Sequence, residues 1–254
     1  MNIIDFSNLI LKKGGHPNQE GEYCVMEAVA VDAGEPKSDH PKCACPVITR
    51  LMVRWNDSFV SDEERTRYCA QFIKPLEGTR STRAVEGKRG QLARDFLFQT
   101  AAPALLTLAG LPDHASKLQA DPTPANARLA RDAARARRDE SWKKIAAAAA
   151  AADADAAADA AADAAADAAA AAAAYAAADA DADADAAAYA AAYAYAAAYA
   201  AADAYAYAKK RADILAAVRE KMAPVRAVLN EGLVALVKAM IAVTPESLEQ
   251  GGAN

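Results

Sequence analysis

Basic residues, glycine and proline are missing from the middle of this 254-residue chain, and cysteine is scarce throughout. Four cysteines are too few for a disulfide scaffold, so we expect a reducing, cytoplasmic setting. There is no long run of large apolar residues, and the first residues lack the basic start and small-residue cleavage site of a signal peptide. We therefore expect neither a signal peptide nor a membrane span.

The absence of glycine and proline is confined to one window. Eleven of each occur in the chain, but none lies between Pro124 and Pro224. Because these two residues are the strongest helix breakers, the window favours helix and the flanks favour shorter elements. The sequence predicts an all-α protein. The expected parts are a helical head domain at 1–121, a linker and basic helix start at 122–145, an Ala/Asp/Tyr repeat at 146–208, C-terminal amphipathic helices at 209–243 and a flexible tail at 244–254.

Apolar spacing and capping residues predict four helices in the head domain. The first covers 20–33 and places Cys24 on its inner side, with Gly34 just beyond its end. The second begins at Pro46, and the third follows Ser61, where Glu64 completes a capping-box pattern. We expect a polar, basic loop at 75–90. The fourth helix covers 91–109 with a kink at Pro103.

An apolar stripe near the C-terminus must be buried against another part of the protein, and the head domain is the nearest candidate. The stripe is interrupted by Pro224 and Gly232. Its members are Val225, Val228, Leu229, Leu233, Leu236, Val237, Met240 and Ile241.

The repeat at 146–208 contains 46 Ala, 10 Asp and 7 Tyr and no other residue. Alanine favours helix over strand, so the strict alternation of the repeat does not indicate a β-strand. Asp and Tyr mostly recur every four residues. Each step advances them by about 400° around a helix, so they follow a spiral and form no straight stripe. A single rod over 125–223 would be about 150 Å long. We favour an antiparallel hairpin, which returns the C-terminal stripe to the head. Alternatively, the repeat is a spacer that arose by slippage of a short repeated DNA unit, and its pattern then has no chemical role.

Thiols and imidazoles near the first expected turn form a candidate metal site. Cysteine and histidine at these spacings can bind zinc in a tetrahedral site, although the spacing is not that of a typical zinc knuckle. The alternative is ordinary thiols with no ligand. Two weaker hypotheses are a catalytic thiol served by His16 or His40, and a carboxylate pair formed by Glu27 and Asp39. The candidate zinc ligands are Cys24, His40, Cys43 and Cys45.

A basic segment precedes the repeat and is a candidate nucleic-acid contact. Arginine and lysine in such a cluster can bind phosphates, but the segment can equally be a solvated helix face that offsets the acidic repeat. The candidate residues are Arg128, Arg131, Arg135, Arg137, Arg138, Lys143 and Lys144.

Several local motifs resemble an uncharacterised family of Ala-rich-repeat proteins from actinobacteria and their phages. The motifs are CVMEA at 24–28, SDHPKC at 38–43, PVI at 46–48, WND at 55–57 and LAGL at 108–111, together with the repeat. The repeat departs from the family because its members commonly carry Arg or Glu there. The resemblance implies an architecture and no known activity.

These features favour a non-enzymatic structural or protein-interaction protein that self-associates or binds a protein partner. Exposed tyrosines provide rigid, amphipathic contact area, so tyrosines of the repeat are the candidate contacts. The alternatives are a metal-dependent or thiol-dependent activity in the head domain and nucleic-acid binding by the basic segment. The candidate contact residues are Tyr189, Tyr193, Tyr195, Tyr199, Tyr205 and Tyr207.

Overall fold

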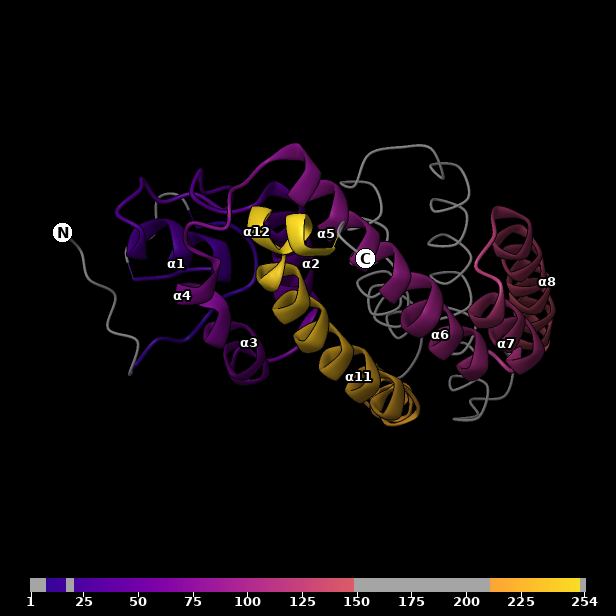
Figure 1. Ribbon diagram of the computed structural model, residues 1–254. Helices are drawn as coiled ribbons and strands as arrows, with labels where there is room; N and C mark the ends of the chain where they lie inside the picture. The colour runs from indigo at the N-terminus through magenta and orange to yellow at the C-terminus, as the bar shows by residue number, and fades with distance from the viewer. Residues whose placement is uncertain (1–7, 17–20, 149–210, 252–254) are drawn as a thin grey trace. The chain divides into compact units, whose positions relative to one another are not determined.

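A computed structural model describes residues 8–16, 21–148 and 211–251, and within these ranges it contains helices and no β-strand (Figure 1). The expected all-α fold is therefore confirmed. In these ranges no helix is long and apolar enough to cross a membrane. The helices are α1 (Val25–Asp32), α2 (Pro46–Ser58), α3 (Asp62–Cys69), the 3-10 turn η1 (Ala70–Phe72), α4 (Ile73–Leu76), α5 (Arg83–Phe96), the π-helical segment η2 (Leu97–Ala101), α6 (Ala102–Leu108), α7 (Pro112–Ala120), α8 (Pro124–Ala148), α11 (Arg211–Ala242) and α12 (Pro245–Gly251).

The described residues form two compact units. The first unit contains residues 8–16, 21–93 and 234–251, and the second contains residues 94–148 and 211–233. The sequence places the end of the head domain at 121, whereas the units divide inside α5 and again inside α11. Each unit therefore combines a segment from before the Ala/Asp/Tyr repeat with a segment from after it.

The first helix starts later than the sequence predicts. The expected helix covers 20–33, but α1 begins at Val25 with Cys24 as its N-cap residue. Cys24 Sγ accepts a hydrogen bond from the backbone N–H of Glu27 at 3.5 Å, and Glu27 Oε2 accepts one from the backbone N–H of Cys24 at 2.8 Å. This reciprocal capping box satisfies two N–H groups that a helix start leaves free. Gly34 follows the helix at φ 75°, as predicted.

The next two helices begin where their capping residues predict. Pro46 is the first residue of α2, and Ser61 Oγ accepts a hydrogen bond from the backbone N–H of Glu64 at 3.2 Å at the start of α3. Aromatic rings from these elements pack with centroids 5.5–6.1 Å apart and form the centre of the first unit's core. The aromatic residues are Trp55, Phe59, Tyr68 and Phe72.

The prediction of a polar loop at 75–90 is wrong for most of that range. α4 ends at Leu76 and α5 already begins at Arg83. The Thr82 hydroxyl accepts a hydrogen bond from the backbone N–H of Val85 at 3.4 Å and so helps to start α5. Gly87 and Gly90 in α5 each cost about 1 kcal/mol relative to alanine, but the burial of one helix face outweighs that cost.

Ahead of Pro103, where a kink is expected, a short π-helical segment, η2, joins α5 to α6. Proline has no N–H, and its ring clashes with the carbonyl four residues earlier, which here belongs to Gln99. A wider turn ahead of Pro103 relieves this clash. α7 then follows as an additional helix with no counterpart among the expected elements, and α8 begins at Pro124 as predicted.

Close helix packing characterises the second unit. Gly232 in α11 lies against Phe96, and a Cβ atom at this glycine would be only 2.5 Å from Phe96 Cε2. Arg137 on α8 donates a hydrogen bond to the carbonyl of Ala109 at 3.4 Å. The two helices that flank the repeat therefore both pack within this unit. The apolar residues that α8 buries are Ala127, Ala130 and Ala134.

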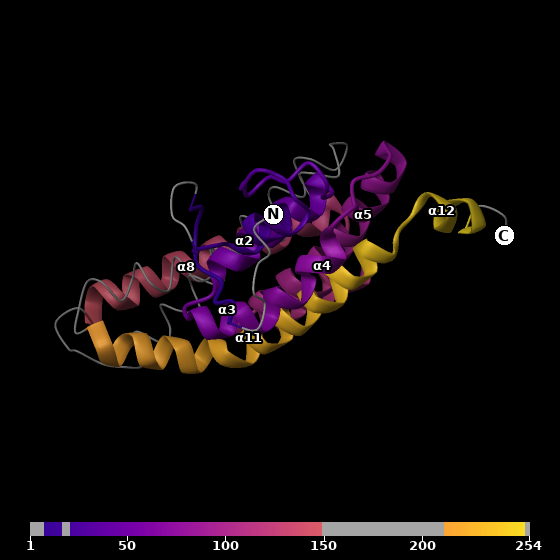
Figure 2. The same ribbon diagram turned by 90° about the vertical axis from the view of Figure 1, so that its left-hand side faces the viewer.

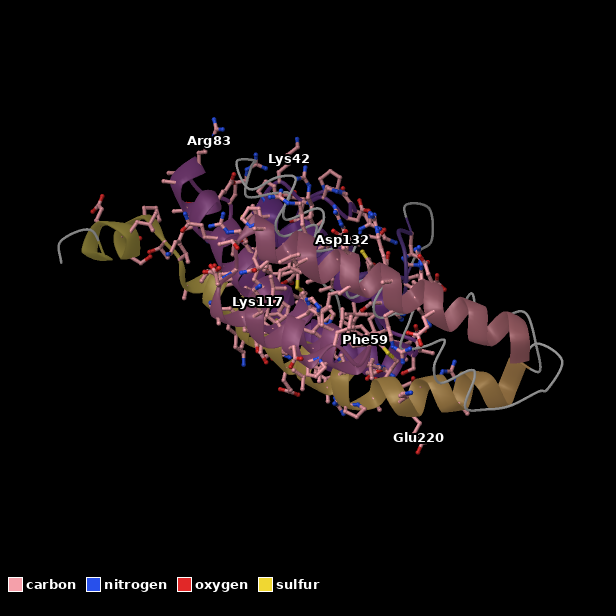
Figure 3. All side chains as sticks on the ribbon, turned by 90° about the vertical axis from the view of Figure 1, so that its right-hand side faces the viewer. Lys42, Phe59, Arg83, Lys117, Asp132 and Glu220 are labelled. Carbon is pink, nitrogen blue, oxygen red and sulfur yellow. The ribbon has the colours of Figure 1, made fainter. Side chains whose placement is uncertain are left out.

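The C-terminal apolar stripe lies on α11, which continues through Pro224 and Gly232 without a break (Figure 2). Val228, expected in the stripe, is 51% exposed, whereas Met222 and Asn230 are buried. On the outer side Glu220 projects away from the helix (Figure 3). The expected stripe residues that are buried are Leu229, Leu233, Leu236, Val237 and Met240.

A buried arginine in the first unit binds the end of α11. Arg89 is 3% exposed and donates hydrogen bonds to the carbonyls of Thr79 at 2.5 Å, Met240 at 2.8 Å and Val243 at 2.8 Å. A cation at this end of a helix satisfies free carbonyls and offsets the helix dipole. This contact joins the end of α11, which carries the last residues of the stripe, to the head domain expected at 1–121. Residues 245–251, expected in a flexible tail, form α12.

Most of the Ala/Asp/Tyr repeat lies outside the described residues, which stop at Ala148 and continue from Arg211. The preference for a hairpin over a rod concerns residues in that gap. It therefore stays a prediction.

Candidate functional site

A buried histidine–glutamate pair lies beside the start of α1. Glu27 is 2% exposed and accepts hydrogen bonds from the backbone N–H of His16 at 2.5 Å and from the backbone N–H of Cys24 at 2.8 Å. The His16 Nδ1 atom lies 3.0 Å from Glu27 Oε2, and its Nε2 atom lies 4.0 Å from Glu22 Oε2. The glutamate thereby fixes the orientation of the imidazole, whose Nε2 atom faces Glu22.

The carboxylates proposed as a pair from the sequence come together at Gly15. A Cβ atom built on this glycine would lie 3.8 Å from Glu27 Oε1 and 3.9 Å from Asp39 Oδ2. Asp39 also lies 2.7 Å from His40 Nδ1, and the His40 side chain is 66% exposed. The Glu27 carboxylate is bonded within the protein, whereas the Asp39 carboxylate reaches the surface.

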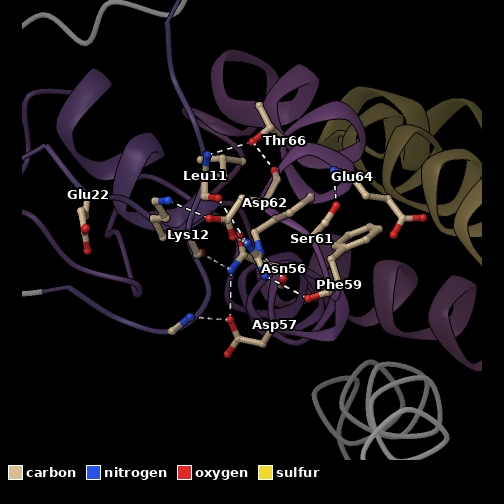
Figure 4. A network of polar contacts seen from close by, with 12 residues as sticks. Leu11, Lys12, Glu22, Asn56, Asp57, Phe59, Ser61, Asp62, Glu64 and Thr66 are labelled. Atoms are coloured by element: carbon tan, nitrogen blue, oxygen red, sulfur yellow. Dashed lines mark hydrogen bonds and ion pairs between the residues drawn. The ribbon is translucent and has the colours of Figure 1, made fainter. Parts of the chain in front are cut away.

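A network of polar contacts holds the segment that carries His16 (Figure 4). Arg65 is 1% exposed and donates to the carbonyls of Asn56 at 2.8 Å, Phe59 at 3.0 Å and Leu11 at 3.3 Å, while also pairing with Asp62. Its guanidinium thereby joins the chain before α1 to the end of α2 and the start of α3. A planar guanidinium suits this role because its donors point in several fixed directions.

Three further contacts fix the same segment. The backbone N–H of Leu11 donates to Thr66 Oγ1 at 2.9 Å, and the backbone N–H of Gly14 donates to Asp57 Oδ1 at 2.8 Å. Lys12 Nζ lies 2.7 Å from Asp62 Oδ2, and this ion pair holds the pKa of Asp62 below its usual value. The segment that leads to His16 is therefore fixed by contacts that are distant in sequence, and no local motif singles out Arg65.

Three cysteines of this region have a raised pKa. Burial raises the pKa of Cys24 to about 12, although the backbone N–H of Glu27 opposes the shift. Burial also raises the pKa of Cys69, and burial together with the nearby Glu35 raises that of Cys43. Because the thiolate is the reactive form, these shifts disfavour thiol chemistry at neutral pH.

The four candidate zinc ligands lie in different surroundings. Cys24 is the N-cap residue of α1, and Cys45 is the fully buried N-cap residue of α2. Cys43 is half-buried and lies close to Glu35, and His40 is exposed beside Asp39. In the described part of the chain no group of three or more His, Cys, Asp or Glu residues has the arrangement needed to hold a metal ion.

The basic segment lies on α8, where several of its arginines have acidic partners. Arg131 pairs with Asp132 at 2.9 Å and Arg138 with Asp139 at 2.9 Å. Arg137 lies 3.8 Å from a carboxylate oxygen of Glu140. Because these arginines are paired with carboxylates, the basic segment presents less positive charge to phosphates than the sequence suggests. Arg128 and Arg135 are exposed, and the side chains of Lys143 and Lys144 lie outside the described residues.

The tyrosines proposed as partner contacts lie in the gap between Ala148 and Arg211, outside the described residues. They are Tyr189, Tyr193, Tyr195, Tyr199, Tyr205 and Tyr207. Comparison of the chain with protein-family models, with curated proteins and with solved structures finds no match.

Proposed function

We propose that the protein is a non-enzymatic structural or protein-interaction protein that presents its Ala/Asp/Tyr repeat to another protein chain. The observation that carries the proposal is the packing of both flanking helices within the second unit. Arg137 on α8 bonds to Ala109, and Gly232 on α11 lies against Phe96. The helices on either side of the repeat are thereby anchored in one unit, and anchoring a segment on both sides lowers the entropy that it loses on binding.

The chemistry of the repeat suits contact with a protein. Its ten aspartates stand without any lysine or arginine, so a partner with basic groups would be attracted to it. Its tyrosines supply aromatic area and hydroxyl groups, a combination that is common at protein interfaces. The high thiol pKa values in the first unit, described above for Cys24 and Cys69, favour this function over a thiol-dependent enzyme. All four thiols are free, which supports a reducing compartment such as the cytoplasm.

Replacement of the six tyrosines by alanine tests the proposal. We expect the wild-type chain to sediment as an assembly or to bind a protein partner, and the six-alanine variant to lose that association. A second variant with phenylalanine at the same six positions is the matched control, because it keeps the rings and removes only the hydroxyl groups. It should retain most of the association if ring area dominates. The six substitutions are at Tyr189, Tyr193, Tyr195, Tyr199, Tyr205 and Tyr207.

The readouts are sedimentation velocity and direct binding of any co-purified partner, with helix content from circular dichroism as the check on folding. Unchanged sedimentation and unchanged binding in a folded six-alanine variant would show that the tyrosines are not contacts. The proposal would then fail.

A further inference from the structure

Two carboxyl groups meet where α1 and α4 end. Asp32 is the last residue of α1, and Glu77 is the C-cap residue of α4, which packs directly against α1. Lys74 Nζ lies 3.4 Å from Asp32 Oδ2 and 3.0 Å from Glu77 Oε2. The side chains of the two acids are only 12% and 21% exposed, respectively. One lysine therefore serves two largely buried carboxyl groups.

Both carboxyl groups have a buried oxygen that is poorly satisfied. Glu77 Oε1 has no hydrogen-bond partner, and Asp32 Oδ2 has only its longer ion-pair contact with Lys74. A buried carboxylate oxygen without a donor costs free energy. Protonation of Glu77 removes a charge and supplies an O–H donor that the Asp32 carboxylate can accept. The missing donor is therefore supplied most simply by a proton held between the two acids.

The surrounding charges also favour the protonated form of Glu77. The last turn of α1 has no basic residue, so the negative end of its dipole acts directly on Asp32. Lys74 is 74% exposed, and water weakens its attraction for the acids. Burial, followed by hydrogen bonding to Asp32, raises the pKa of Glu77.

The charged groups that act most strongly on Glu77 are Asp32 on α1 and Lys74 on α4. Within the described residues, neither α2, which packs on α1, nor η1, which precedes α4, supplies one of these groups. Glu35, in the loop after α1, instead accepts a hydrogen bond from the backbone N–H of Lys42 at 2.6 Å. The pKa of Glu77 is thus influenced mainly by one acid, Asp32, and one exposed base, Lys74.

We propose that Asp32 and Glu77 share a proton and form a proton-operated latch between α1 and α4. While the proton is bound, one carboxyl donates to the other and the two helix ends are joined. When the proton leaves for water, two carboxylates face each other and Lys74 offsets only part of their repulsion. The latch belongs to the first unit and is independent of the function proposed for the repeat.

The direction of the pH dependence follows from the raised pKa of Glu77. The folded state holds this proton more tightly than the unfolded chain, where the pKa is near the ordinary 4.5. The stabilisation that the latch provides is therefore fully present when the pH is below that ordinary pKa. It is lost as the pH rises through the raised value.

Thermal unfolding of the full chain at several pH values tests the latch. We expect Glu77→Gln to raise the Tm by about 2–4 °C at neutral pH, because the amide donates to Asp32 without a second charge. The difference should disappear near the ordinary Glu pKa. Glu63→Gln is the matched control, since Glu63 is exposed in the first turn of α3, where a negative charge is favourable. It should give no rise. A lower Tm for Glu77→Gln at neutral pH would overturn the proposal.

Carboxyl-carbon NMR titration of the full chain provides a second measurement that does not depend on the stability of a variant at Glu77. The Glu77 carboxyl should titrate above its ordinary pKa in the wild-type chain. In Asp32→Asn its titration should move back toward the ordinary value. An ordinary titration of Glu77 in the wild type would show that no proton is shared.

Discussion

The elements around Arg65 in the first unit and the helix α8 in the second unit are fixed in different ways. α2 and α3 bury large aromatic rings, and a buried arginine joins them through backbone carbonyls. α8 buries three alanines, and alanine removes little apolar area from water. The first region therefore depends on polar bonds and side-chain volume, whereas the second depends on small residues that let helices approach closely.

This difference predicts which substitutions each region tolerates. Removing a buried donor should damage the first region most, because several acceptors lose their partner at once. Adding a methyl group should damage the second region most, because its helices have no spare space at their contacts.

Arg65→Met has the largest expected effect. It keeps much of the side-chain volume but leaves the carbonyls of Leu11, Asn56 and Phe59 and the carboxylate of Asp62 without this donor. We expect a loss of about 3–5 kcal/mol in the free energy of unfolding, measured by urea denaturation.

Arg50→Met is the matched control, because Arg50 is an exposed arginine on α2 of the same unit. It should change the free energy of unfolding by less than about 1 kcal/mol. Equal losses in the two variants would show that the network around Arg65 does not hold the segment before α1.

The sequence predicted those parts of the first unit that depend on neighbouring residues. Pro46 and Ser61 mark helix starts through contacts within a few residues, and both predictions are confirmed. The contact between Arg65 and Leu11 spans 54 residues, so no local pattern could indicate it. Arg65 lies in a stretch of charged residues that is typical of a solvated helix. Its burial depends on the positions of the backbone carbonyls around it, which only the structure gives.

The candidate site was only partly predictable for the same reason. Cys24 follows an apolar spacing that suggested a helix interior, although Glu27 three residues later is the capping-box signal with a thiol in the usual place of a hydroxyl. The convergence of Glu27 and Asp39 at Gly15 depends on how the turn after α1 folds back. Proximity in sequence was a poor guide to the zinc hypothesis, because Cys45 is buried at the start of another helix.

A pair of glycine substitutions tests close helix approach, with Gly232 on α11 in the second unit and Gly87 on α5 in the first unit as the control. Gly232→Ala should lower the free energy of unfolding by about 1–3 kcal/mol, because the new Cβ atom would lie 2.5 Å from Phe96 Cε2. Gly87→Ala should instead raise it by about 0.5–1 kcal/mol, because this helical glycine has nothing within 4 Å of its Cβ position. Chemical denaturation of both variants gives the comparison. A gain in stability for Gly232→Ala would mean that close approach does not hold α11.

The smallest expected effects are at the arginine pairs of α8. Arg131→Ala and Arg138→Ala each remove an ion pair with a neighbouring aspartate whose side chain is 58–59% exposed. Exposed pairs contribute little, so each variant should lose no more than about 0.5 kcal/mol in urea denaturation, and the loss should shrink further in salt. Asp132→Ala is the matched control from the other side of one pair and should give a change of the same size. A loss well above this value would show that α8 is held by polar side chains as α3 is, and the contrast between the two regions would no longer hold.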